Sequence, residues 1–139
     1  MDDIDGSHSF ELPNGETVGL HLKIRGCMIA EKHFTPQSTT SVDEIVILAL
    51  RGNMTALRSL YVGAIAGFRS KKGERSPVPS DDEVAEILDA FEDPFAAVLH
   101  VVHAHKLAWP DRELGDSDPK DEDPDEGKTE APASDGADS

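Results

Sequence analysis

The sequence changes character at Asp111, and this change limits how much of the chain can build a folded core. The last 29 residues, 111–139, hold twelve acidic residues against three basic ones, and only four of them are apolar. Ordering a backbone costs about 1–2 kcal/mol per residue, and a segment with so little apolar surface does not recover that cost. We therefore expect a disordered acidic tail over 111–139, a flexible N-terminus over 1–8 and a single folded domain over 9–110.

The charge of the chain restricts its partners. The net charge is −15, and the tail carries −9 of it. Nucleic acids and anionic membranes are bound by clustered lysine and arginine, so we expect neither as a partner. The longest uninterrupted apolar run, Ile45 to Leu50, is six residues long, far short of the ~20 that span a bilayer. The first residues are acidic, without an apolar signal segment, so we expect a cytoplasmic protein.

The first part of the domain has the pattern of a β-hairpin. Pro13-Asn14-Gly15 is a strong turn signal, because asparagine and glycine tolerate a positive φ. Apolar residues alternate with polar ones on both sides of this turn, through Leu12 before it and from Val18 to Ile24 after it. This alternation predicts two half-buried strands, the second longer than the first. Residues 26–34 fit either a short helix or a strand.

Helical signals dominate from Ser41 onward. Ser41 to Glu44 and Ser80 to Glu83 both have the spacing of a capping box, in which a side chain and a backbone amide satisfy each other at a helix start. Asp93-Pro94 predicts a third start, and apolar residues recur every three or four positions over 54–68. Gly63 and Gly67 within that stretch indicate close helix packing. The fold class is therefore α+β, a small N-terminal hairpin followed by a compact bundle of about four helices.

The candidate catalytic and metal-binding residues are few. His100 and His103 lie three residues apart and share a helix face, whereas His105 points elsewhere. No Asp or Glu lies between Phe95 and Trp109, so a first shell of metal ligands is incomplete there. Cys27 is the only cysteine, which rules out an intramolecular disulfide and indicates a structural thiol. We therefore expect no enzyme, no metal and no cofactor.

Two surfaces remain as candidate contact sites. One is the basic loop formed by Arg69, Lys71, Lys72 and Arg75, which would contact an acidic partner or remain solvated. The other is an apolar groove, because the helices carry more apolar stripes than one small core needs, and an amphipathic partner helix would fill the excess. The free edge of the hairpin also allows self-association. The predicted groove residues are Leu57, Tyr61, Ile65, Phe68, Val98, Leu99 and Val102.

The order of elements resembles that of tail assembly chaperones of long-tailed phages and related gene transfer agents. Those proteins commonly begin with a strand, a Pro-Asn/Asp-Gly turn and a second strand, as in Phe10-Glu-Leu-Pro-Asn-Gly-Glu-Thr-Val18, and continue as short helices. The resemblance covers the layout of 9–109 and brings no catalytic residues. It implies a non-enzymatic factor in the host cytoplasm that binds the tape measure protein and keeps it soluble until tail tube subunits assemble around it.

Two other function classes stay open at this point. An acidic DNA mimic would inhibit a DNA-binding protein by presenting ordered carboxylates in place of phosphates, and the acids between Asp81 and Asp93 are its candidates. A metal enzyme would use His100 and His103 as ligands.

Overall fold

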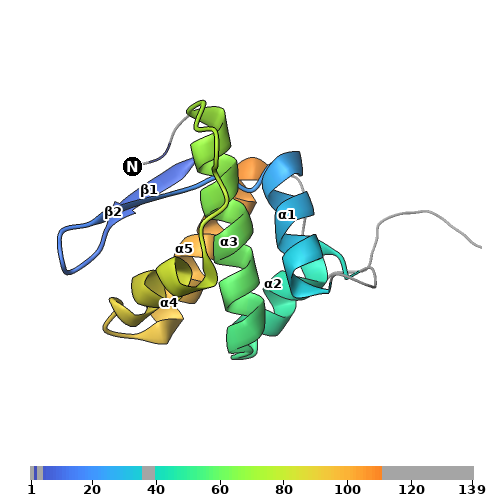
Figure 1. Cartoon of the computed structure of the whole chain (residues 1–139). Coiled ribbons are helices and arrows are strands. Elements are labelled where there is room, and N and C mark those ends of the chain that lie inside the picture. The colour runs from blue at the N-terminus through green and yellow to red at the C-terminus, as the bar shows by residue number, and fades with distance from the viewer. Residues whose placement is uncertain (1, 3–4, 36–39, 111–139) are drawn as a thin grey trace, which may run out of the picture.

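The computed structural model describes residue 2, residues 5–35 and residues 40–110 (Figure 1). The tail predicted over 111–139 lies outside these described residues. An antiparallel hairpin is followed by five helices, so the α+β class is confirmed. The elements are β1 (His8–Glu11), β2 (Thr17–Leu20), α1 (Ile24–Phe34), α2 (Val42–Leu50), α3 (Met54–Lys71), α4 (Asp81–Asp89) and α5 (Pro94–Ala108).

The predicted turn closes the hairpin. The backbone N–H of Leu12 donates to the carbonyl of Glu16 at 2.7 Å, and the Asn14 side-chain oxygen accepts from the N–H of Glu16 at 2.9 Å. Gly15 has a φ of 90°, a conformation that glycine adopts without the steric penalty of a Cβ. The turn sets the register of the pair, in which Phe10 lies opposite Val18.

The second strand is shorter than predicted, and the expected strand from His21 to Ile24 is wrong. Pairing stops at Leu20, opposite the first residue of β1. The next backbone N–H, that of His21, donates instead to the carbonyl of Ala64 on α3 at 2.9 Å. Leu22 is still buried, but Ile24 already begins α1. A backbone bond to α3 thus replaces the ladder, and the ambiguous segment 26–34 is helical, which adds a fifth helix to the predicted four.

The helix starts follow the sequence signals with one exception. Ser41 and Glu44 form the complete capping box at α2. At α4 the Ser80 hydroxyl accepts from the N–H of Glu83 at 3.0 Å, but the Glu83 carboxylate does not return to Ser80, because it pairs with Arg69 on α3. The second predicted capping box is therefore only half formed. Side chains also cap α3 and α5, from Asn53 and Asp93 respectively.

Helix α3 is the axis of the bundle. It contacts every other helix and β2, and Figure 1 shows it running through the middle of the molecule. A helix with neighbours on all sides must be apolar over most of its circumference, which is why small and apolar residues fill its centre. The largest fully buried apolar side chains are Tyr61, Leu20, Leu22, Ile45, Leu57, Leu60, Val46, Val62, Val84 and Val101.

Glycines allow α1 to cross α3 closely, as predicted for Gly63 and Gly67. A Cβ on Gly67 would overlap the carbonyl oxygen of His21, just before α1, and a Cβ on Gly63 would lie 2.8 Å from the backbone nitrogen of Ala30 on α1. Real Cβ atoms do not approach backbone this closely. The absence of side chains at these positions therefore brings the two helix backbones into direct contact.

Candidate functional site

The predicted groove on α3 and α5 is largely core. Leu57, Tyr61, Ile65 and Val98 are all buried, and the Tyr61 hydroxyl donates to the carbonyl of Ala97 at 2.7 Å. Burial raises the pKa of this hydroxyl, so it stays protonated as the donor. These four side chains face the interior of the bundle, so the predicted groove is core at these positions.

The other three groove residues lie nearer the surface. Leu99 is 51% exposed, whereas Val102 is half-buried against the core. Phe68 is half-buried, and the amines of Lys71 and Lys72 lie 5.6 and 5.2 Å from the centre of its ring. Of the predicted set, Leu99 is the side chain most available to another molecule.

A different apolar groove lies beside α1. Ile24 and Met28 are one turn apart on this helix and are 66% and 63% exposed. They border a hollow of about 180 Å³. Trp109, which follows α5, is fixed at the end of this hollow by a hydrogen bond from its indole N–H to the carbonyl of Leu22 at 2.7 Å. We call this surface the α1 groove; its lining residues are Ile24, Cys27, Met28, Glu31, Val42, Asp43, His105 and Trp109.

The polar groups of the α1 groove are mostly acidic. The Glu31 carboxylate accepts from the backbone N–H of Val42 at 2.8 Å, and Asp43 Oδ1 lies 3.3 Å from Nε2 of the buried His105. A positively charged side chain, that of Lys23, lies close to Trp109, with its amine 5.1 Å from the centre of the Trp109 ring. The groove therefore combines an apolar border with two carboxylates.

A second apolar hollow of about 280 Å³ lies where α3 begins and α4 ends. The exposed side chain of Met54 stands at its edge. Its walls are largely core residues and a proline, and its single carboxylate is that of Asp89. The α1 groove differs in having two exposed apolar side chains on one helix face.

The predicted basic loop is already engaged within the chain. Arg69 forms two hydrogen bonds to Glu83, one of them 3.3 Å long, which raise the pKa of the guanidinium and lower that of the carboxyl. The Lys71 amine pairs with Asp5 and donates to the Ser7 hydroxyl at 3.1 Å. Two of the four predicted contact residues therefore hold the fold together. Lys72 and Arg75 are exposed.

The Ser7 hydroxyl lies beside a histidine and a lysine, as a catalytic serine often does, but it is not exposed to solvent. It lies 3.0 Å from Nδ1 of His21 and accepts from the Lys71 amine, yet Ser7 is fully buried. Burial also lowers the pKa of His21. These contacts tie the N-terminal segment to the end of α3.

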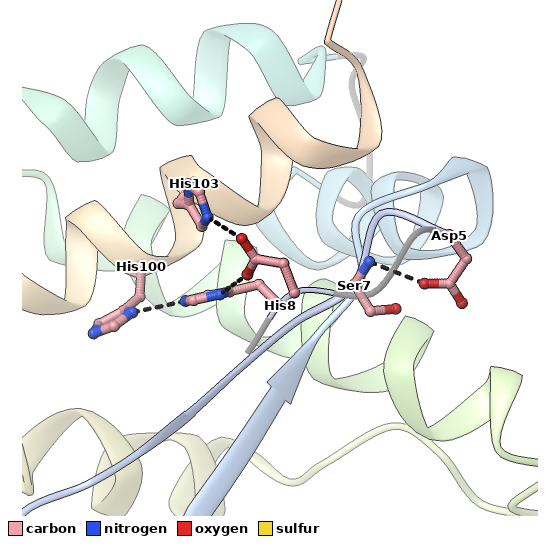
Figure 2. A network of polar contacts seen from close by, with 6 residues as sticks. Asp5, Ser7, His8, His100 and His103 are labelled. Atoms are coloured by element: carbon pink, nitrogen blue, oxygen red, sulfur yellow. Dashed lines mark hydrogen bonds and ion pairs between the residues drawn. The ribbon is translucent and has the colours of Figure 1, made fainter.

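The histidines of α5 are separated by the fold, as their spacing predicted. His105 lines the α1 groove. His100 and His103 instead face the hairpin, as Figure 2 shows. His8 on β1 lies between them, with Nε2 2.9 Å from His100 Nδ1. The Asp2 carboxylate joins the cluster through His8 at 2.6 Å and His103 at 2.9 Å. Hydrogen bonds to His103 and then His8 lower the pKa of Asp2, while burial, followed by the charges of His8 and His103, lowers that of His100.

Two of the acids that a DNA mimic would use are already engaged in contacts within the chain. The Asp81 carboxylate lies 2.8 Å from Nε2 of His33, which lowers its pKa, and Glu83 is bound to Arg69. Ordered carboxylates that already have cationic or hydrogen-bonding partners are poor substitutes for free phosphates.

Sequence reasoning missed both the α1 groove and the role of the N-terminal residues. The four-residue spacing of Ile24 and Met28 is a usable signal for the groove, but the alternating pattern places Ile24 at the end of a strand and leaves Met28 in the segment 26–34, which fits either a helix or a strand. Nothing in the sequence places Asp2 and His8 beside α5. They come together only because the hairpin folds back on that helix.

Neither membrane-spanning helices nor similarity to known proteins points to a function for this chain. Within the described residues, no helix is both long and apolar enough to cross a membrane. No family model matches the chain, and no curated protein and no solved structure matches it either.

Proposed function

We propose that this protein is a non-enzymatic, chaperone-like factor that holds an amphipathic helical segment of another polypeptide in the α1 groove. The observation that carries this proposal is the exposed pair Ile24 and Met28, one helical turn apart beside a hollow. Large apolar side chains grouped beside a groove are typical of sites that receive a partner helix, which inserts its own side chains at three- and four-residue spacing.

The groups around the groove define the partner further. Glu31 and Asp43 line the groove while keeping their contacts to the Val42 N–H and to His105. A carboxylate can accept several hydrogen bonds, so a lysine or arginine next to the partner's apolar stripe can add to these contacts. The net charge of −15 also accelerates encounter with a basic segment, because opposite charges steer association. The occupant is therefore a basic amphipathic helix, not an acidic or uniformly polar one.

A tail assembly chaperone is the protein-binding factor that best fits the hairpin and the short helices that follow it. Its client would be the tape measure protein, in the cytoplasm of the host cell. Such a client is long and helical, and its apolar stripe aggregates unless another surface covers it. A strongly charged factor keeps the bound complex soluble, because like charges oppose association between complexes.

The proposal is tested with a defined peptide. The probe is an 18-residue helix with leucines at three- and four-residue spacing and lysines elsewhere, and its control has the same composition with the leucines spread around the helix. We expect fluorescence anisotropy to give a dissociation constant of about 10–100 µM for the first peptide. Exchanging both Ile24 and Met28 for serine should weaken binding at least tenfold, because the border of the groove is lost.

The matched control is Val78→Ser. Val78 is exposed like Met28 but lies in the loop before α4, outside the groove, so this variant should bind like the original protein. Equal affinity of the double variant, or equal affinity for both peptides, would show that the α1 groove is not the binding site. Dimers that form without peptide and vanish in the double variant would identify a second copy of the chain as the occupant and contradict the proposal.

A further inference from the structure

Three side chains of metal-binding type, from distant parts of the chain, meet at one place. Asp2 comes from the N-terminal segment, His8 from β1 and His103 from α5. One ligand atom of each lies within 4.8 Å of the other two. The Asp2 carboxylate is 2.6 Å from His8 Nδ1 and 2.9 Å from His103 Nε2. In a tetrahedral site with bonds of about 2.0–2.1 Å, neighbouring ligand atoms are about 3.3–3.4 Å apart. Rotation of the exposed Asp2 and His103 side chains around the buried His8 ring would bring the three ligand atoms to this spacing.

A further histidine fixes the orientation of the His8 ring. His8 Nε2 lies 2.9 Å from Nδ1 of His100, as Figure 2 shows. The His100 ring is itself held by stacking on Phe10, with ring centres 3.8 Å apart. Without an ion, His8 Nδ1 carries the proton that the Asp2 carboxylate accepts. If a metal ion replaced that proton, the remaining ring proton would sit on Nε2 and be donated to His100 Nδ1. Metal-binding histidines typically use the second ring nitrogen in this way, and the outer partner fixes both the tautomer and the ring.

The cluster gathers three imidazole rings around one carboxylate. In the described part of the chain, one carboxylate, that of Asp2, accepts from His8 and His103 while His100 bonds to His8. The ring centre of His8 is 5.2 Å from that of His100 and 4.7 Å from that of His103. Three imidazole rings and one carboxylate are therefore gathered closely enough for one cation to contact several of them.

We infer that Asp2, His8 and His103 bind a first-row divalent cation, with Zn²⁺ the ion that this ligand set suits best and with water completing the coordination. Two imidazoles and one carboxylate form a borderline ligand set for Zn²⁺, Ni²⁺ and Cu²⁺, whereas Mg²⁺ and Ca²⁺ prefer all-oxygen sites. The side chains of Asp2 and His103 are 41% and 47% exposed, so an ion reaches the site from solvent. Binding would fasten the N-terminal segment to α5. This inference is independent of the α1 groove.

Isothermal titration of the full, tag-free protein with ZnCl₂ at pH 7.5 tests the site. We expect one ion per chain with a dissociation constant on the order of 1 µM, reversal by a chelator, and a rise of a few degrees in melting temperature, because the ion binds the folded state alone. His103→Ala and Asp2→Ala should each weaken binding at least 30-fold. Both side chains are well exposed, so neither variant is expected to unfold the protein.

His33→Ala is the matched control. His33 also has a ring nitrogen 2.8 Å from a carboxylate, that of Asp81, but it lacks the other ligands of the cluster. Its removal should leave Zn²⁺ affinity unchanged. Titrations that give no binding below about 1 mM, unchanged affinity in His103→Ala, or equal losses in His103→Ala and His33→Ala would each overturn the site.

His100→Phe separates ring orientation from simple packing. Phenylalanine keeps an aromatic ring against Phe10 but removes the acceptor for His8, so we expect a 10–100-fold loss of Zn²⁺ affinity, the usual effect of removing an outer hydrogen-bonding partner. His100→Gln restores an acceptor and should recover part of that loss. Full affinity in His100→Phe would refute the orienting role of His100.

Discussion

Helices α3 and α5 are both long and largely apolar, but the rest of the fold surrounds them differently. Eleven of the eighteen residues of α3 are buried, against six of the fifteen of α5. One helix has neighbours on all sides, whereas the other presents Phe95, Leu99 and His103 to the surface. The comparison teaches that apolar periodicity alone does not identify a binding helix. The apolar side chains of α3 are used almost entirely in the core. The two proposed sites lie on other elements: the α1 groove beside α1, and the metal site between the N-terminal segment, β1 and α5.

The largest expected effect comes from placing a methyl group at the centre of α3. Gly63→Ala would put a Cβ against the backbone of α1 at Gly26 and Ala30, so the two helices must separate. We expect a loss of about 2 kcal/mol in the free energy of unfolding, even though alanine is about 1 kcal/mol better than glycine within a helix. Urea denaturation followed by circular dichroism measures this loss.

Leu99→Lys on α5 provides the contrast. Because Leu99 is about half exposed, we expect this substitution to change the free energy of unfolding by no more than about 0.5 kcal/mol. Equal changes in the free energy of unfolding for Gly63→Ala and Leu99→Lys would show that enclosing α3 on all sides does not make it more sensitive to substitution than α5.

An intermediate effect is expected where the two helices meet. Tyr61→Phe removes only the hydroxyl that donates to the Ala97 carbonyl, and the aromatic ring stays in the core. One buried hydrogen bond contributes about 1 kcal/mol, so the unfolding midpoint should fall by a few degrees. An unchanged or raised midpoint would mean that this bond does not fasten α5 to α3.

The smallest effect concerns the N-terminal segment and depends on pH. The ion pair with Lys71 lowers the pKa of Asp5 from 3.8 to about 2. Because the pKa is lower in the folded state, the pair stabilises the fold above pH ~4, and its contribution disappears as the pH falls from about 4 to 2. The Asp5 side chain is 44% exposed, so solvent screening limits the contribution to a few tenths of a kcal/mol.

Asp5→Asn isolates this contribution. The difference in unfolding free energy between the original protein and the variant should be constant from pH 7 to about 5 and shrink toward zero near pH 2. Urea titrations at four pH values across this range measure it. A difference that stays constant down to pH 2 would show that Asp5 does not titrate through its contact with Lys71.

Features set by neighbouring residues were predictable from sequence. The Pro13-Asn14-Gly15 turn, the box at Ser41 and the start of α5 at Asp93 all depend on contacts within five residues. Gly63 and Gly67 also pointed to close packing, although not to the helix against which they pack. The end of β2 was not predictable, because it depends on a hydrogen bond from His21 to Ala64, 43 positions later.

The amino-acid order alone fixed the α+β class, the positions of most helix starts and the strongly acidic composition, because propensity, capping and charge act over a few residues or over the whole chain. Tertiary structure decided which apolar stripes are hidden and which polar groups meet. His8 and His103 are 95 positions apart, and only the packing of the hairpin on α5 brings them to one carboxylate. Such a meeting depends on the path of the backbone between the residues, and no local pattern records that path.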